Sequence, residues 1–465
     1  MANRKKAFRI VGLAADILIL GGVVALVVLS IDDPPPDVAG LRVKRLDIPP
    51  AENGFVILGQ AVAKLDLNLD APAADDKPQA KLEQFDRMGR GQEWDAALAE
   101  EVLARNAEAL ALWEKALAAP HFQRPEVRSM DDVRAPTYPW LDFAGLVCVR
   151  AQARAKQGHC AAAFDDLVSV LRLGHRVEQS KGHAVTWLVG YAIKDRGYSL
   201  MRQMLPEAAL TPQQLRAYAR QIAAFPADAG GYADAFRNEY TVQAGMIDGM
   251  VSGETPASST TGETFEGVAR WFRRTVYKPF IKPNRTKALL AEIARGRGDN
   301  GLKHFKDAFK YVFDDDESVL GADKRNLLGA VLARVLAGSG DGMPAIKCHE
   351  NVGLAVTRLF LAAKAYRVEK GRLPERLDQL VPDYLDSVPV DDFDGKPLRY
   401  NAAKKIIYSV GKDLRDDGGM TKKEYVDFRV KQSAIDPKYI GAEELKSYED
   451  EYPGQGPDPS FPIDF

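Results

Sequence analysis

Residues 141–178 read LDFAGLVCVRAQARAKQGHCAAAFDDLVSVLRLGHRVE, and this stretch decides the fold class. Apolar side chains recur at helical spacing on both sides of Gly158, the residue type that most readily turns the chain. The pattern predicts a helix over 141–156, a turn at Gly158 and a second helix over 161–178. Two helices joined by a tight turn are the repeating unit of helical repeat domains.

The same stretch resembles one tetratricopeptide unit. Gly158 matches the turn glycine of that family, and Ala163 matches the small residue where the two helices cross. Ala151 is similarly small on the first helix. The resemblance implies an α-solenoid-like domain, in which helix pairs stack on their neighbours.

Helical patterns continue on both sides of this stretch, so we assign residues 91–337 to one helical domain. Thr211 is followed by proline and, three residues on, by glutamine, a capping box that predicts a helix start. Trp94, Trp113 and Trp187 are expected to be buried in the domain. Residues 32–90 read as a linker and irregular segment with one helix. Helices are expected over 55–67, 94–117, 184–204 and 232–250, near 266, 283 and 303, and over 323–336.

Residues 10–31 form an apolar stretch interrupted by Asp16. A helix of this length spans about 33 Å, enough to cross a bilayer. Basic residues in 1–9 precede it and two aspartates follow it, so the positive-inside rule predicts a cytoplasmic basic stub. We expect a single-pass anchor in the inner (cytoplasmic) membrane with the bulk of the chain periplasmic. A cleaved signal peptide is the alternative.

Residues 343–430 differ from the helical domain, because both helical and strand patterns occur there. A long helix is expected over 352–370, ending at Gly371, and a short one over 377–380. Asp394-Gly395 signals a tight turn, and short strands are expected over 398–400 and 406–410. Residues 431–465 read as an acidic tail containing proline and glycine. The fold class is therefore mainly α: a transmembrane helix, an α-solenoid-like domain and a small α+β module.

The order of these features resembles the globular part of the type II secretion major pseudopilin. The matching motifs are the helix that ends at Gly371, the Pro374–Leu380 turn, the Asp392–Pro397 turn and the acidic glycine loop that follows. The resemblance implies a module for assembly and a calcium site in that loop. In pseudopilins this helix continues directly from the membrane helix, whereas here over 300 residues intervene.

The expected calcium ligands follow the second strand. Asp413, Asp416 and Asp417 are three carboxylates within five residues, and the resemblance assigns them to calcium together with Ser409. The Ser409 hydroxyl and a carbonyl such as that of Val410 would help to complete the shell. Calcium takes about six to eight oxygen ligands, so further oxygens would be needed. A solvated Asp-Gly turn without metal is the alternative.

Composition and motifs limit the functions that remain. Lys and Arg number 63 against 65 Asp and Glu, and so near-neutral a chain argues against a nucleic-acid partner. The sequence contains no H-E-x-x-H, G-x-S-x-G or P-loop motif, so we assign no catalytic residue. We expect a membrane-anchored extracytoplasmic scaffold of the bacterial envelope, linked to a secretion-type assembly, whose helical domain binds an unknown protein partner. The rival hypothesis is an extracytoplasmic hydrolase with its site in a groove of the helical domain.

Overall fold

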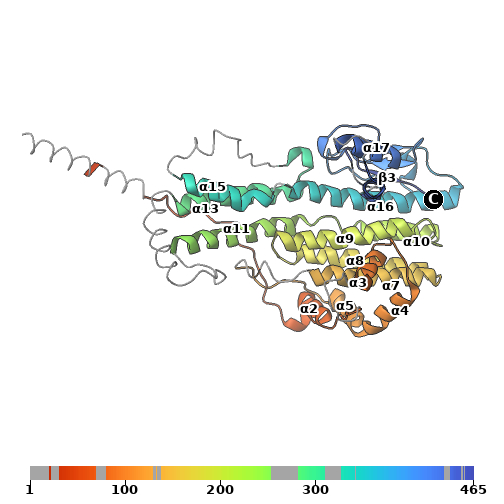
Figure 1. Ribbon diagram of the computed structural model, residues 1–465, viewed down its shortest axis with the longest axis horizontal. Helices are drawn as coiled ribbons and strands as arrows, with labels where there is room; N and C mark the ends of the chain where they lie inside the picture. Colours follow the sequence, from red (N-terminus) through yellow and green to blue (C-terminus); the bar gives the residue numbers. More distant parts are fainter. Residues whose placement is uncertain are drawn as a thin grey trace, which may run out of the picture.

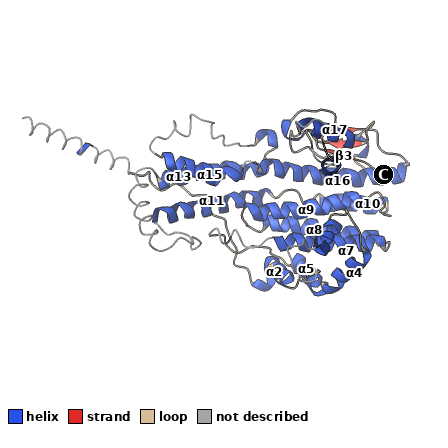
Figure 2. Cartoon of the chain, in the orientation of Figure 1, coloured by secondary structure: helices blue, strands red, loops and turns tan. Residues whose placement is uncertain are grey.

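The structure is a computed structural model that describes residues 20–21, 31–69, 80–128, 132, 138–252, 281–308, 326–340, 342–433, 440–451, 454 and 456–465. Within these residues the chain is mainly helical and carries one small antiparallel sheet (Figures 1 and 2). Long helices run side by side along the longest axis, and the sheet lies against one of them (Figure 1).

The elements have the following bounds. The α-helices are α2 (Gly54–Ala63), α3 (Ala80–Gly89), α4 (Ala96–Arg105), α5 (Ala107–Ala118), α7 (Tyr138–Lys156), α8 (Cys160–Gln179), α9 (Ala184–Met204), α10 (Pro212–Ile222), α11 (Ala229–Ser252), α13 (Pro283–Gly298), α15 (Leu327–Ala337), α16 (Met343–Lys370), α17 (Lys422–Gln432) and α18 (Ala442–Glu451). The 3-10 helices are η1 (Pro50–Glu52), η3 (Asp299–Leu302), η4 (Phe305–Asp307), η5 (Gly338–Gly340), η6 (Leu377–Leu380) and η7 (Gly411–Asp413). The strands are β1 (Arg399–Asn401), β2 (Ile406–Tyr408) and β3 (Ser460–Pro462).

The helix–turn–helix predicted around Gly158 is present as α7 and α8. Gly158 adopts φ +83°, a left-handed conformation that glycine enters without steric cost. Ala151 and Ala163 are fully buried. Asp166, on α8, pairs with Arg150 at 2.6 Å and with Arg154 at 2.8 Å. The two helices are therefore joined by apolar packing and by a shared, nearly buried carboxylate.

A pair of glycines sets the distance between α8 and α9. A Cβ at Gly174 would lie 2.5 Å from the carbonyl oxygen of Gly190, and a Cβ at Gly190 would lie 2.7 Å from that of Gly174. Real Cβ atoms do not approach so closely, so only glycine permits this crossing. Helix α9 has the predicted bounds, and the capping box at Thr211 that starts α10 is confirmed.

The helix predicted over 94–117 is two helices, α4 and α5. They separate at Asn106, whose buried amide nitrogen donates to the carbonyls of Asp66 and Val102, while its side-chain oxygen accepts from the Asp66 amide. The hydrogen bonds to the Asp66 backbone hold Asn106 in a non-helical conformation. Trp113 and Trp187 are buried as predicted. Trp94 is only partly buried, with the Lys156 ammonium 5.2 Å from its ring.

Residues 32–90 contain more order than a linker. Helices α2 and α3 lie there, and Leu58, Phe85 and Met88 join the main core. Asn53 caps α2 by accepting a hydrogen bond from the Phe55 amide. Stretches that are rich in Pro, Asp and Gly here join short apolar helices that pack on α5 and α7.

The C-terminal module shares its core with the helical domain. Helix α16 begins at Met343, nine residues earlier than predicted, and ends at Gly371 as predicted, with φ +72° there. It packs against α9 and α10, and one core cluster continues from α2 to Ile463. Helix α16 is buried over most of its length because the helices lie on one side and the sheet on the other (Figure 1).

The predicted hairpin is present, and the tail adds a strand to it. Strands β1 and β2 pair antiparallel with Tyr400 opposite Ile407, and β3 pairs antiparallel with β2, placing Phe461 opposite Ile407. The sheet order is β1-β2-β3. Gly395 adopts φ +75° in the predicted tight turn. Residues from the expected tail thus complete the sheet.

Several expectations lie outside the described residues. These are the helix near 266 and, except for Leu20, Gly21 and Ile31, the apolar span over 10–31. Among the helices that are described, none combines the length and the apolar character needed to cross a bilayer. Near residue 303, where a helix is predicted, the chain forms the short 3-10 helices η3 and η4.

Candidate functional site

The residues expected to bind calcium lie in one loop but do not converge. The Ser409 hydroxyl donates to Asp391 Oδ1 at 2.9 Å, and the Val410 amide donates to Asp391 Oδ2 at 2.9 Å. Asp413 accepts from the Arg415 amide, and the Asp417 amide donates to Asp458. Across the described part of the chain, no group of three or more His, Cys, Asp or Glu side chains is arranged to hold a metal. Calcium binding stays a prediction.

An arginine supplies a positive charge beside this loop. The guanidinium of Arg399, on β1, lies 2.9 Å from Asp391, 2.5 Å from Asp394 and 3.4 Å from Asp416. Asp416 also accepts from the Tyr408 hydroxyl. One of the expected calcium ligands is thus engaged by a side-chain cation.

Asp458 is the acid beside this loop that the sequence did not suggest. Its Oδ2 accepts from the amides of Asp417 and Gly419 at 2.8 and 3.0 Å, whereas its Oδ1 has no partner among the described residues. Burial raises the pKa of Asp458 to about 6. The residue lies about forty positions beyond the loop, and only the pairing of β3 with β2 brings it there.

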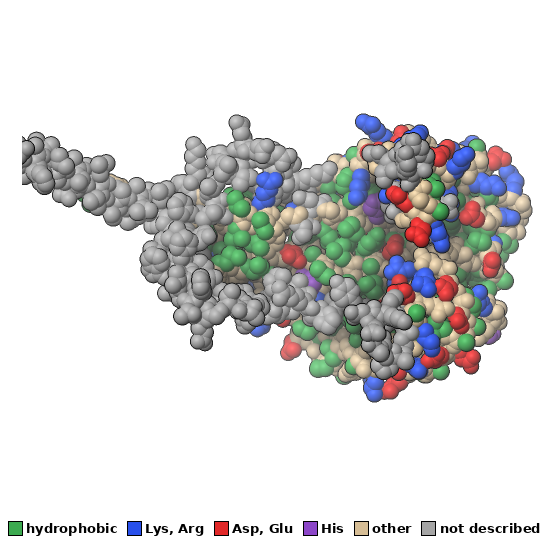
Figure 3. Space-filling view, in the orientation of Figure 1, with side chains coloured by type: hydrophobic (Ala, Val, Ile, Leu, Met, Phe, Trp, Pro, Cys, Tyr) green, Lys and Arg blue, Asp and Glu red, His purple; other side chains and the backbone are tan. Residues whose placement is uncertain are grey.

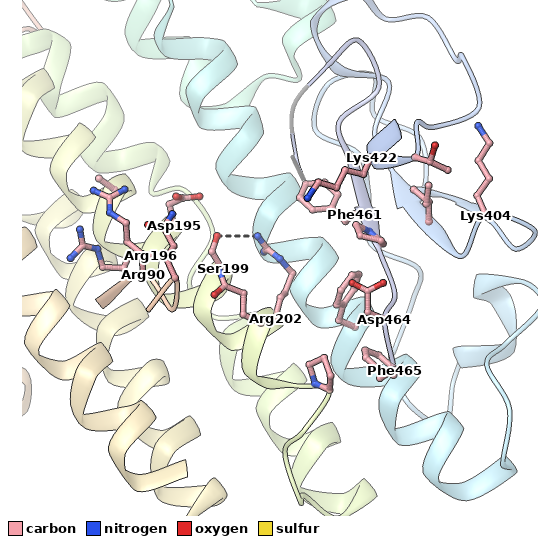
Figure 4. Close-up of a pocket in the computed structure, with 18 of the residues that line it drawn as sticks. Arg90, Asp195, Arg196, Ser199, Arg202, Lys404, Lys422, Phe461, Asp464 and Phe465 are labelled. Atoms are coloured by element: carbon pink, nitrogen blue, oxygen red, sulfur yellow. Dashed lines mark hydrogen bonds between the residues drawn. The ribbon is translucent and has the colours of Figure 1, made fainter. Parts of the chain in front are cut away.

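The described surface has a cleft of about 870 Å³ between α9 and the C-terminal module. Figure 4 shows one wall formed by α9 and the other by the sheet and the residues after β3. On α9 the lining residues recur every three or four positions, so a single stripe of that helix faces the cleft: Tyr191, Ala192, Asp195, Arg196, Ser199, Arg202 and Gln203.

The wall opposite α9 carries apolar side chains beside the polar residues Lys404, Thr421, Lys422 and Asp464. Phe360 from α16, Ile406 from β2 and Phe461 from β3 are buried and contribute to the lining, and Phe465 stands edge-on to Phe360 at 6.1 Å. A volume of this size lies within the roughly 300–1,000 Å³ of typical ligand sites, which combine apolar walls with a few polar groups.

Most of the cations around the cleft have acidic partners. Arg90 and Arg196 both pair with Asp86, at 2.9 and 2.7 Å, and Lys404 pairs with Glu424 at 2.9 Å. Figure 3 shows Lys and Arg side chains beside acidic ones at the level between α9 and the module. The count of cations therefore overstates the positive charge that a ligand would meet.

Arg202 is different, because its hydrogen-bond partners are all neutral. Its Nη1 donates to the Gly353 carbonyl at 3.2 Å and to the Thr357 hydroxyl at 2.8 Å, and its Nη2 donates to the Ser199 hydroxyl at 3.0 Å. Among the described residues, no carboxylate comes within 4.0 Å of its guanidinium. Burial lowers the pKa of Arg202.

Packing fixes the position of Arg202. Its guanidinium carbon lies 5.0 Å from the ring centre of Tyr198 and 5.3 Å from that of Phe461. Gly353 is required for this arrangement, since a Cβ there would lie 2.7 Å from the Tyr198 ring. The side chain thus reaches from α9 toward α16 at the floor of the cleft (Figure 4).

The described lining offers no paired acid and base. Its two carboxylate side chains, Asp195 and Asp464, lie on opposite walls (Figure 4). Outside the cleft, His304 Nδ1 lies 2.8 Å from Asp392 Oδ1. The nearby thiol of Cys348 donates to the Asp392 carbonyl, and burial raises its pKa, which disfavours the reactive thiolate. What the described lining offers an occupant is hydrogen-bond donors beside aromatic rings.

Sequence reasoning missed the cleft, because its walls lie far apart in the chain. One signal was available. Arg202 has the apolar residues Leu200, Met201 and Leu205 as close neighbours in the sequence. A cation among core residues needs either a buried partner or an opening to solvent.

No protein-family model, curated protein or solved structure matches this chain.

Proposed function

We propose that this chain is a membrane-anchored extracytoplasmic interaction protein of the bacterial envelope, and that the cleft beside α9 receives its partner. The observation that carries the proposal is the cleft itself, which has apolar rings on one wall and an uncompensated guanidinium at its floor. Apolar walls that surround a few placed polar groups are typical of binding sites.

The position of the cleft supports a scaffold role. Its lining comes from the loop after α3, from α7, α9, α16 and the start of α17, from the sheet and from the residues after β3, so an occupant would contact both the helical domain and the C-terminal module. Occupancy would hold the two parts together, and it would be weakened by any change that separates them. The apolar span over 10–31 would keep this surface at the membrane, and the pseudopilin-like order of the module suggests a secretion-type assembly as its setting.

Affinity capture of the tagged full-length protein from detergent-solubilised membranes tests the proposal. Ala192 lines the cleft, and Ala192→Trp should fill part of it. Ala111→Trp is the matched control, because Ala111 is exposed on α5 and is not part of the lining.

A partner that co-purifies with the wild type and with Ala111→Trp should be lost with Ala192→Trp. Recovery of the same partners with all three proteins, or of none with the wild type, would contradict the proposal. Equal thermal unfolding of the two variants is required, so that loss of the partner reports on the cleft and not on the fold.

A further inference from the structure

The donors of Arg202 are only partly used. A guanidinium carries about five N–H donors, and three of those of Arg202 are directed at Gly353, Thr357 and Ser199. The Nε–H and one Nη2–H have no acceptor among the described residues. Nε and Nη2 form one edge of the guanidinium, and a carboxylate can accept two parallel hydrogen bonds from such an edge.

Neighbouring charges leave this edge in need of an anion. The nearest acid on the same face of α9 is Asp195, which acts on Arg202 only at longer range and forms no ion pair with it. Of the other cations in the lining, Arg90 and Arg196 share Asp86, Lys404 pairs with Glu424, and Lys422 also has an interaction partner. Arg202 is thus the lining cation whose hydrogen bonds go to neutral groups, and a negative group can pair with it.

The surroundings of that point are apolar. Phe461 and Tyr198 flank the guanidinium, and Phe360 and Phe465 continue the wall. A negative group placed there would be partly shielded from water, which strengthens a charge-assisted hydrogen bond. The atoms next to it would contact aromatic rings. A cleft of about 870 Å³ is larger than one small carboxylate needs, so the occupant should extend beyond the charged group.

From these observations we infer that Arg202 anchors an acidic side chain in an extended segment of a partner protein, and that apolar residues flanking this acid pack against Phe360, Phe461 and Phe465. This inference rests on the proposed function, because it names the chemistry of the partner at the same cleft. The specificity comes from the guanidinium edge, and the apolar wall contributes affinity without discriminating sharply between sequences.

A pair of synthetic peptides tests the inference. The first is acetyl-Gly-Glu-Phe-Glu-Leu-Gly-amide, and the second has glutamine in place of both glutamates and almost the same shape. Binding of each peptide to the full-length protein in detergent is measured by isothermal titration. The glutamate peptide should bind about tenfold more tightly, as expected when a charge-assisted pair replaces a neutral one.

Variants assign this difference to Arg202. The discrimination between the peptides should disappear in Arg202→Met and shrink in Arg202→Lys, because an ammonium keeps the charge but cannot offer the paired edge. Arg372→Met is the control, since Arg372 is exposed and its carboxylate partner is Glu375. Should Arg202→Met fail to fold, the comparison of the two peptides on the wild type still decides.

Two outcomes would overturn the inference. The first is equal affinity for the two peptides, or discrimination that survives in Arg202→Met. The second is displacement of the glutamate peptide by inorganic phosphate at the same concentration as the peptide, which would make Arg202 a general anion site. Either result would leave the proposed function intact if Ala192→Trp still abolishes capture of the partner, so the two failures can be told apart.

Discussion

Two of the cations on helix α9, Lys194 and Arg202, lie about two turns apart, and their surroundings are opposite. Lys194 is 1% exposed, lies 2.8 Å from Glu178 and also pairs with Glu350 from α16. Arg202 is partly open to the cleft and has only neutral partners. One helix thus contains a buried cation that is paired with two carboxylates and, about two turns further on, a partly exposed cation that has no carboxylate partner among the described residues.

The difference separates charges that hold the fold from charges that are open to a ligand. Burying a cation is costly unless acidic partners or several hydrogen bonds offset the loss of hydration. Two carboxylates around Lys194 exceed its charge, and burial, together with the adjacent Glu350, raises the pKa of Glu178 well above its usual value. Arg202 avoids the need for such partners because it borders the cleft.

Breaking the sealed cluster should have the largest effect. Lys194→Met leaves Glu178 and Glu350 buried without a cation and should lower the free energy of unfolding by about 3–5 kcal/mol. Chemical denaturation of the full-length protein measures this. Lys370→Met, at an exposed position, should stay within about 0.5 kcal/mol of the wild type. Equal stability of the two variants would show that the buried cluster does not join α9 to α16.

Removing Arg202, the cation that borders the cleft, should lower the free energy of unfolding by less than removing Lys194. Arg202→Met deletes three hydrogen bonds to neutral groups that water from the cleft can partly replace, so the free energy of unfolding should fall by about 1–2 kcal/mol. The same denaturation experiment checks this value. A loss as large as that of Lys194→Met would identify Arg202 as a structural residue and remove the contrast between the two cations.

Asp458 extends the comparison to an acid. Like Lys194 it is buried, but it forms no ion pair with the described residues. Its pKa is raised from 3.8 to about 6, so its favourable contribution to stability is complete below pH 3.8 and is lost as the pH rises through about 6. Asp458→Asn keeps an acceptor for the two backbone amides and does not titrate. Its stability relative to the wild type should increase between pH 4 and pH 6 and then level off. A pH-independent difference would contradict this account.

Calcium should have the smallest effect. If the loop after Ser409 binds it, millimolar calcium should raise the unfolding temperature slightly, since extracellular-type sites bind at about 10⁻⁴–10⁻³ M. Replacing Asp416 and Asp417 together by alanine should remove the shift. An unfolding temperature that does not respond to millimolar calcium would end the expectation, and the Arg399 guanidinium beside Asp416 would then be the cation that serves this loop.

Local features of the fold could be predicted, and long-range ones could not. Gly158, Thr211 and Gly371 each mark a helix boundary through the conformation or capping of a single residue. The local sequence was therefore sufficient to predict where these helices begin or end. The break at Asn106 depends on a contact with Asp66, forty residues away.

The same division explains the candidate site. Its walls come from residues as far apart as Arg90 and Phe465. The expected calcium ligands are close in sequence, yet Ser409 and Val410 donate to Asp391 and the Asp417 amide donates to Asp458, which only the folded chain brings near. The sequence indicated a loop after Ser409, but it did not determine which groups that loop would contact.

Site-specific photo-crosslinking in intact cells tests most directly whether the cleft receives a partner. Gln203 is exposed and lines the cleft one residue after Arg202, so a photoreactive residue there should form one discrete adduct with a partner protein. This adduct should disappear when Ala192→Trp fills the cleft, and it should weaken with Arg202→Met. An adduct that persists unchanged in both variants, or the absence of any adduct from Gln203, would contradict the proposal that the cleft receives a partner.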